Sequence, residues 1–189
     1  MTTETPLPVT TGRLVLRAHR AEDLEPLLAY YADPEVARYL LEEPWTPEVA
    51  EAQLAKRLAR TRIDEPGSAL ALVVEHDGQV VGDVALWTTG DTVSRGEIGW
   101  VFHPDHTGQG FATEAVRAVL DLAFGFYRMH RVVAQLDSRN APSARLCERV
   151  GMRREGHLRQ DWWSKGEWTD TLVYGVLKDD RATLAPQWA

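Results

Sequence analysis

The sequence predicts a single-domain α/β (α+β) fold in which helices flank a mixed, mostly antiparallel sheet. Its 189 residues are 44% apolar, which suits one compact domain with a full core. Strand-like and helix-like patterns follow one another in the order βααβββαβαββ. One strand–helix–strand crossover, from residues 95–102 to residues 131–136, requires a parallel central pair, whereas hairpins join other strands in antiparallel fashion.

The first part of the chain combines one strand with three helices. Alternating apolar and polar residues predict the strand, and Leu24 and Leu28 share one face of the first helix. In the third helix, Val49, Leu54 and Leu58 are expected to face inward. The elements expected here are a strand over residues 13–18 and helices over residues 21–31, 34–39 and 47–62.

Hairpins and the crossover make up the rest of the chain. His76-Asp77-Gly78 is a strong turn signal between two apolar strands. Gly151 ends a helix as a left-handed C-cap. The elements expected here are strands over residues 69–75, 79–87, 95–102, 131–136, 152–163 and 167–177, and helices over residues 111–124 and 140–149.

Composition excludes several classes of protein. No run of 18 apolar residues occurs, and the first ten residues lack the pattern of a secretory signal. A formal charge of −7 argues against a nucleic-acid binder. Cys147 is the sole cysteine, so we expect no internal disulfide, a buried inert thiol and a cytoplasmic location. His103 and His106 have no partners at metal-ligand spacing, so no metal site is expected. We expect one domain over residues 11–180 between flexible tails of residues 1–10 and 181–189.

A polar turn with two glycines, Thr107-Gly108-Gln109-Gly110, joins the central strand to a long amphipathic helix. Glycine lets the backbone take positive φ and approach a ligand, and the helix N-terminus attracts anions, so the turn predicts a phosphate site. A P-loop would need Gly-Lys-Ser/Thr, and a dinucleotide-binding loop would need glycine where Thr113 occurs. A simple connecting turn and the pyrophosphate loop of acyl-CoA N-acyltransferases are the other two interpretations.

Short motifs follow one another along the chain: Glu97-Ile98-Gly99-Trp100, His103-Pro104, Gly108-Gln109-Gly110-Phe111-Ala112-Thr113-Glu114-Ala115, Asn140-Ala141-Pro142-Ser143 and Val150-Gly151-Met152. Together they resemble the GNAT superfamily, and more closely its RimJ/RimL-like branch. The resemblance extends from Thr11 to the last strand. It departs at Asp105, where the superfamily usually has Gln or Arg, so the anion contacts are expected to fall on backbone amides.

The resemblance implies an enzyme that uses acetyl-CoA as co-substrate, bound where the two central parallel strands splay apart. Gly99 is the expected place for a β-bulge at this point. The pantetheine arm is expected to pair with the backbone of the central strand and to contact Asn140, which also caps the following helix. The implied acetyl-CoA contacts are Trp100, Val101, Phe102, Thr107, Gly108, Gln109, Gly110, Phe111, Ala112, Thr113, Asn140 and Ser143.

Amide formation needs an amine that loses its proton and a thiolate that is stabilised as it leaves. The resemblance assigns the general base to Glu97 and the stabilisation of the thiolate to Ser143. The alternatives are a solvated or ion-paired glutamate and a solvated helix serine. His157, near Asp161 in the sequence, is a second candidate for proton transfer, ranked below Glu97.

The expected acceptor is a primary amine, either a protein N-terminus or a small molecule such as a polyamine, an antibiotic or an amino-acid derivative. Trp45 lies in a loop where relatives build the acceptor pocket, and acids near it either attract a cationic amine or form a solvated face. A non-catalytic acyl-CoA sensor or scaffold and a longer donor such as succinyl-CoA stay as alternatives. A monomer or homodimer is expected. The acids near Trp45 are Asp33, Glu35, Glu42 and Glu43.

Overall fold

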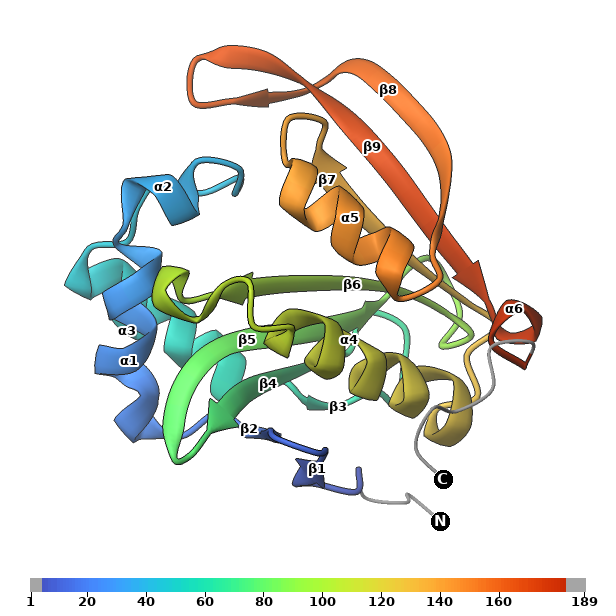
Figure 1. The fold of residues 1–189 in the computed structure, drawn as a ribbon, viewed down its shortest axis with the longest axis horizontal. Coiled ribbons are helices and arrows are strands. Elements are labelled where there is room, and N and C mark those ends of the chain that lie inside the picture. The colour runs from blue at the N-terminus through green and yellow to red at the C-terminus, as the bar shows by residue number, and fades with distance from the viewer. Residues whose placement is uncertain (1–4, 183–189) are drawn as a thin grey trace.

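The computed structural model describes residues 5–182, which form a nine-stranded sheet with helices packed on it (Figure 1). The strands are β1 (Val9–Thr10), β2 (Val15–Ala18), β3 (Thr61–Arg62), β4 (Ala69–His76), β5 (Gln79–Thr88), β6 (Arg95–Phe102), β7 (Arg131–Asp137), β8 (Arg153–Ser164) and β9 (Glu167–Leu177). The helices are α1 (Leu24–Tyr31), α2 (Pro34–Ala37), α3 (Pro47–Leu58), α4 (Phe111–Asp121), α5 (Ala141–Arg149) and α6 (Lys178–Ala182).

The sheet has the strand order β1-β2-β4-β5-β6-β7-β9-β8, and the short β3 pairs with β4 beside this path. The pairing is antiparallel throughout except between β6 and β7, which are parallel. This confirms the predicted mixed, mostly antiparallel sheet with a central parallel pair.

The parallel pair is short, because β6 and β7 pair only over Arg95–Glu97 and Arg131–Val133. Beyond Glu97, β6 continues along β5 and β7 continues along β9, so the two strands splay apart as predicted (Figure 1).

The predicted β-bulge at Gly99 is wrong, because the β5–β6 register runs without a shift. A neighbour favours glycine at this position: a Cβ there would lie 3.2 Å from Cη2 of Trp87, a tight contact. The aromatic ring therefore covers the backbone at Gly99.

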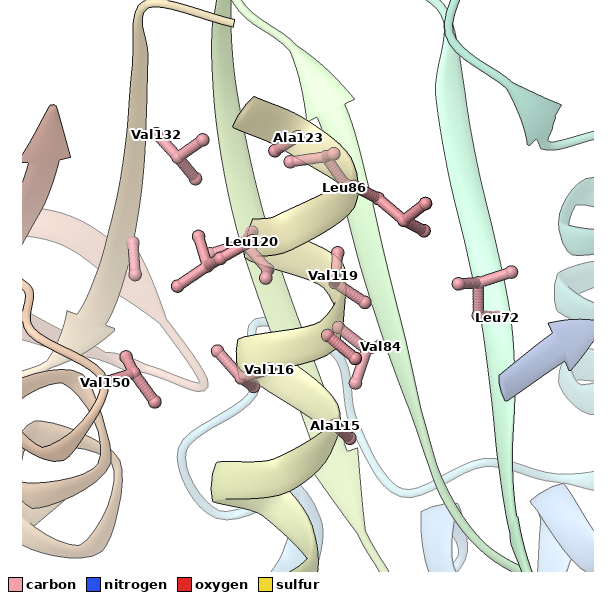
Figure 2. Packing of buried hydrophobic residues seen from close by; sticks show 14 of the residues in the cluster. Leu72, Val84, Leu86, Ala115, Val116, Val119, Leu120, Ala123, Val132 and Val150 are labelled. Carbon is pink, nitrogen blue, oxygen red and sulfur yellow. The ribbon is translucent and has the colours of Figure 1, made fainter. Parts of the chain in front are cut away.

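The main core lies between α4 and the sheet. Figure 2 shows Val119 of α4 beside Val84 of β5, and Leu120 on the side of the helix toward Val132 of β7. The apolar periodicity of this helix thus gives the face that the sequence predicts. The α-helix ends at Asp121 rather than at residue 124, and a π-helical turn follows over Leu122–Phe126. The wider turn keeps Leu122, Ala123 and Phe124 all buried.

A second apolar cluster packs on the opposite face of the sheet. Val101 contacts this cluster, whereas its neighbours Trp100 and Phe102 contact the main core, as alternation along a strand requires. The cluster consists of Leu27, Tyr30, Tyr31, Trp45, Ala50 and Leu54.

A buried ion pair lies beside this second cluster. The Arg57 guanidinium of α3 lies 3.3 Å from the Asp83 carboxylate of β5 and 4.8 Å from the centroid of the Trp45 ring. Arg57 lies on the inward face of α3. Leu54 lies on the same face and is buried as expected. Val49 and Leu58, expected inside, are instead 39% and 42% exposed.

Other helix boundaries also differ from expectation. The helix expected over residues 21–31 begins with a 3₁₀ turn, Ala21–Asp23, because the Asp23 carboxylate turns inward to bind Arg17 and the Arg20 amide. The helix expected over residues 34–39 ends at Ala37. The third helix ends at Leu58 because Thr61–Arg62 pairs with β4 as β3.

Part of the expected N-terminal tail is structured. Val9 and Thr10 pair with Leu16 and Val15 of β2. Residues 5–8 are also described, and residues 181–182 lie at the end of α6, whereas residues 1–4 and 183–189 lie outside the described residues. Within the described residues, no helix combines the length and apolar character that crossing a membrane requires.

Candidate functional site

A cleft of about 1480 Å³ runs along β6 and the N-terminal parts of α4 and α5. The segment before β2 and the residues of and after α2 complete its walls. The predicted acetyl-CoA contacts all line this cleft except Gln109. The structure therefore brings together residues from the central strand, the glycine turn and α5 that are far apart in the sequence.

The glycine turn has the geometry that its sequence predicts. Gly108 and Gly110 have φ angles of 76° and 82°, and Gly110 is the N-cap of α4. The first hydrogen bond of the helix joins the Glu114 amide to the Gly110 carbonyl, so the amides of Phe111, Ala112 and Thr113 precede the helical ladder. No side chain caps this end of the helix. It is therefore suited to bind an anion.

The N-terminus of α5 forms the facing wall. The Asn140 side chain accepts a hydrogen bond from the Ser143 amide at 3.1 Å, which confirms it as the helix cap. The indole N–H of Trp100 donates to the Ser143 hydroxyl at 3.3 Å. This hydrogen bond spans the gap that opens between β6 and α5.

Glu97 lies where β6 and β7 separate, opposite Val133 in the last parallel pair. It is half-buried, and its carboxylate accepts a hydrogen bond from the Gln135 side chain at 3.2 Å. Burial raises the pKa of the Glu97 carboxyl above its usual value, and the bond from Gln135 opposes this shift. Glu97 is not among the residues that line the cleft. It has the strand parity of Val101, so it faces away from Trp100 and Ser143.

The histidines have other partners than the sequence suggested. His157 pairs with Asp170 at 2.7 Å rather than with Asp161, because these two residues lie on the adjacent strands β8 and β9. His103 accepts a hydrogen bond from the Asp105 amide, and the Asp105 side chain is 84% exposed. In the described part of the chain, no group of three or more His, Cys, Asp or Glu residues could hold a metal ion.

Trp45, in the loop where an acceptor pocket is expected, does not line the cleft. Its ring is buried and stacks on Tyr31 with centroids 3.8 Å apart, and its N–H donates to Glu42. Of the acids near it, Asp33 caps α2 and Glu35 lines the cleft.

Three arginines in the cleft wall were not singled out in the sequence: Arg13, Arg117 and Arg149. The Arg117 side chain donates to the Arg149 carbonyl at 2.8 Å, and Arg149 donates to the Thr113 hydroxyl at 3.3 Å. Arginine next to a glycine turn favours phosphate groups, but only the fold brings these positions together.

Cys147 has the buried environment that the sequence predicts. Burial raises the pKa of its thiol to about 12, so the thiol stays protonated at neutral pH. A covalent acyl-cysteine is not supported by this geometry.

A family model described as an acetyltransferase (GNAT) domain matches residues 13–153. The chain belongs to the GNAT acetyltransferase family. This GNAT protein is 28% identical to the uncharacterized N-acetyltransferase YnaD of Bacillus subtilis over 91% of the chain and 98% of that protein.

Two solved structures share its fold. Mycobacterium smegmatis RimJ, in complex with CoA-disulfide, superposes with a TM-score of 0.78 at 24% identity, over 96% of this chain and 91% of that one. Spermidine N-acetyltransferase from Vibrio cholerae, in complex with CoA and spermine, superposes with a TM-score of 0.77 at 23% identity, over 91% and 99%. The chain is thus an N-acetyltransferase of the GNAT family that uses acetyl-CoA.

Proposed function

We propose that this enzyme transfers the acetyl group of acetyl-CoA to a primary amine by direct attack within a ternary complex. The observation that carries the proposal is the separation of β6 and β7, with Ser143 on one side of it and Glu97 at its apex. The donor occupies the cleft, and the acceptor reaches the thioester from the face of the sheet that bears Glu97.

The cleft accounts for each part of the donor. Beyond Glu97, no strand in the described part of the chain pairs with the β7-facing edge of β6, so its backbone groups can hydrogen-bond to the pantetheine amides. The diphosphate binds at the glycine turn and the N-terminus of α4. Arg117 and Arg149 bring positive charge to the wall near α5 and favour a further phosphate.

In the reaction, the amine nitrogen attacks the thioester carbonyl carbon, the C–S bond breaks, and the thiolate of CoA leaves. Ser143 accepts the Trp100 N–H through its oxygen, so its own O–H proton is free to donate to the departing sulfur. The position of Ser143 in the first turn of α5 adds the positive end of the helix dipole.

Glu97 takes the proton that the amine loses, directly or through water. Its raised pKa makes it a stronger base than an exposed glutamate. His157 is the second candidate, but its hydrogen bond with Asp170 holds it in the exposed β8–β9 hairpin.

The acceptor is a protein N-terminus or a small-molecule amine. The net charge of −7 favours a cationic acceptor. The spermidine N-acetyltransferase of Vibrio cholerae shares the fold, so polyamines are included among the amines to be tested. A cytoplasmic location and a monomeric or homodimeric state stay predictions.

The proposal is tested by calorimetric titration with acetyl-CoA and CoA, followed by thiol release over a panel of polyamines, amino-acid amines and peptides with free N-termini. Succinyl-CoA is run beside acetyl-CoA. We expect acetyl-CoA binding and thiol release with at least one amine. Thiol release from no amine, with acetyl-CoA bound, would favour the sensor alternative, and a preference for succinyl-CoA would reject the acetyl donor.

Variants then test the residues. Ser143→Ala and Glu97→Gln should each lower kcat by about 10²-fold or more, with CoA binding largely intact. Glu43→Gln removes an exposed acid outside the cleft and serves as the control. Normal turnover by both active-site variants would reject the assigned chemistry.

A further inference from the structure

The turn between β1 and β2 reaches the anion site at the start of α4, although about a hundred residues separate the two in the sequence. Within the turn, the Thr11 amide donates to the Leu14 carbonyl, and the Leu14 amide donates to the Thr11 hydroxyl. The turn is therefore held in shape by its own hydrogen bonds. Gly12, Thr11 and Arg13 line the cleft.

Glu114 of α4 is the anchor of this contact. Its Oε1 accepts from the Thr11 hydroxyl at 2.6 Å and from the Arg13 amide at 2.9 Å. Its Oε2 accepts from Nε of Arg13 at 2.8 Å and lies 2.7 Å from Nη2. Although burial alone would raise the pKa of Glu114, these donors hold it below its usual value. Glu114 therefore does more than complement the helix dipole, because it ties α4 to the N-terminal turn.

Arg13 also holds the glycine turn itself. Its Nη1 donates to the Gln109 carbonyl at 2.9 Å, and its guanidinium lies 4.7 Å from the centroid of the Phe111 ring. Gln109 lies between the two positive-φ glycines, so this bond fixes the peptide at the centre of the turn. The planar fork of arginine can make these contacts at once, whereas lysine would supply a single point charge.

Charge makes this contact important for an anionic ligand. The carboxylates of Asp105 and Glu114 both lie close to the turn in the sequence, and Glu114 lines the cleft. Unpaired, the Glu114 carboxylate would repel a diphosphate. Arg13 neutralises it, and the terminal guanidinium nitrogens each keep a second N–H. The side chain is 47% exposed and lines the cleft.

We infer that Arg13 is a positioning and specificity residue for the donor: it shapes the Gly108–Gly110 turn, neutralises Glu114 and directs its remaining N–H groups at the diphosphate of acetyl-CoA. The inference rests on the proposed placement of the diphosphate at this turn. It predicts that Arg13 matters for a donor that carries the diphosphate and not for one that lacks it.

The test compares Arg13→Gln with the parent enzyme on acetyl-CoA and on S-acetylpantetheine, which has the same thioester without the nucleotide. We expect the KM for acetyl-CoA to rise about tenfold or more with kcat little changed, since a charge-assisted bond is lost. The KM for S-acetylpantetheine should stay the same. Arg60→Gln, an exposed arginine outside the cleft, is the matched control.

A second variant separates repulsion from misfolding. In the Arg13→Gln background, Glu114→Gln removes the uncovered carboxylate, and we expect it to recover part of the lost affinity for acetyl-CoA. Equal KM changes on both donors, no recovery in the double variant, or an unchanged KM in Arg13→Gln would overturn the inference. Failure of the parent enzyme to release thiol with any amine would instead contradict the proposed function.

Discussion

The indole N–H of Trp100 donates to the Ser143 hydroxyl at 3.3 Å and joins the central strand to the helix that faces it across the cleft. The bond leaves the hydroxyl proton of Ser143 free while fixing the position of the oxygen. Trp100, which was predicted to contact acetyl-CoA through its backbone, thus orients the side chain of Ser143, to which the stabilisation of the leaving thiolate is assigned.

Trp100→Phe keeps an aromatic ring in the cleft wall but removes the donor. We expect kcat to fall by about three- to tenfold with little change in KM, because one neutral hydrogen bond contributes about 0.5–1.5 kcal/mol. The measurement is a double-mutant cycle with Ser143→Ala. If Trp100 acts through Ser143, Trp100→Phe should have no further effect on kcat once the hydroxyl is gone. Additive losses would contradict this coupling.

The pH dependence of turnover reports on Glu97. A general base works only when ionised, so kcat/KM should fall as the pH drops through the raised pKa of Glu97. Gln135→Ala removes the bond that opposes the shift, so this limb of the profile should move to higher pH. Profiles are measured with one acceptor, and the limb should be absent in Glu97→Gln. An unchanged limb in Glu97→Gln would assign the proton transfer to another group.

His19 should make folding sensitive to acid. Its ring is 6% exposed, neither ring nitrogen has a hydrogen-bond partner, and burial lowers its pKa to about 4, amid opposing charges of Asp83, Asp23, Arg57 and Arg17. The unfolded chain binds the proton more tightly, so stability falls as the pH drops from about 6.5 to 4. The contribution of His19 to this loss is about 3 kcal/mol.

Urea unfolding at pH 7, 5.5 and 4 measures the effect of His19. His19→Phe should lose this part of the pH dependence, whereas the exposed His130→Gln should keep it. Parallel curves for His19→Phe and the parent protein would reject the assignment.

Removing one partner of the Arg57–Asp83 pair should lower the free energy of unfolding strongly. Arg57→Met leaves a buried carboxylate held only by the hydroxyls of Tyr30 and Tyr31, and we expect a loss of about 3–5 kcal/mol in the free energy of unfolding. Adding Asp83→Asn should recover part of it. The exposed Arg38–Glu35 pair gives the control, and Arg38→Met should change stability by less than about 0.5 kcal/mol. Similar losses in the two single variants would contradict the role of burial.

Local patterns predicted most of the sheet and the shape of the glycine turn. The crossover through α4 implied the parallel pair, and Gly108 and Gly110 adopt the positive φ that their place before a helix suggests. Asn140 caps α5 as its sequence predicts. The glycine turn and the cap depend on neighbours within a few residues, and the parallel pair follows from a single crossover through one helix, so a single sequence contains the necessary information.

The errors come from contacts between distant residues. Apolar periodicity placed Val49 and Leu58 inside, but the buried Asp83 draws Arg57 to the inner face of α3. In the site, Glu97 has the strand parity of Val101 and faces away from Trp100, and only the fold shows that Ser143 lies on the Trp100 side. Arg13 was overlooked because nothing near it in the sequence indicates Glu114.

The N-terminal turn also sets an order of events during synthesis. Arg13 leaves the ribosome 101 residues before Glu114, and at about 5–20 residues per second the interval is roughly 5–20 seconds. The N-terminal turn can therefore contact Glu114 only after α4 has been synthesised. The bond from Arg13 to the glycine turn also forms only at that stage.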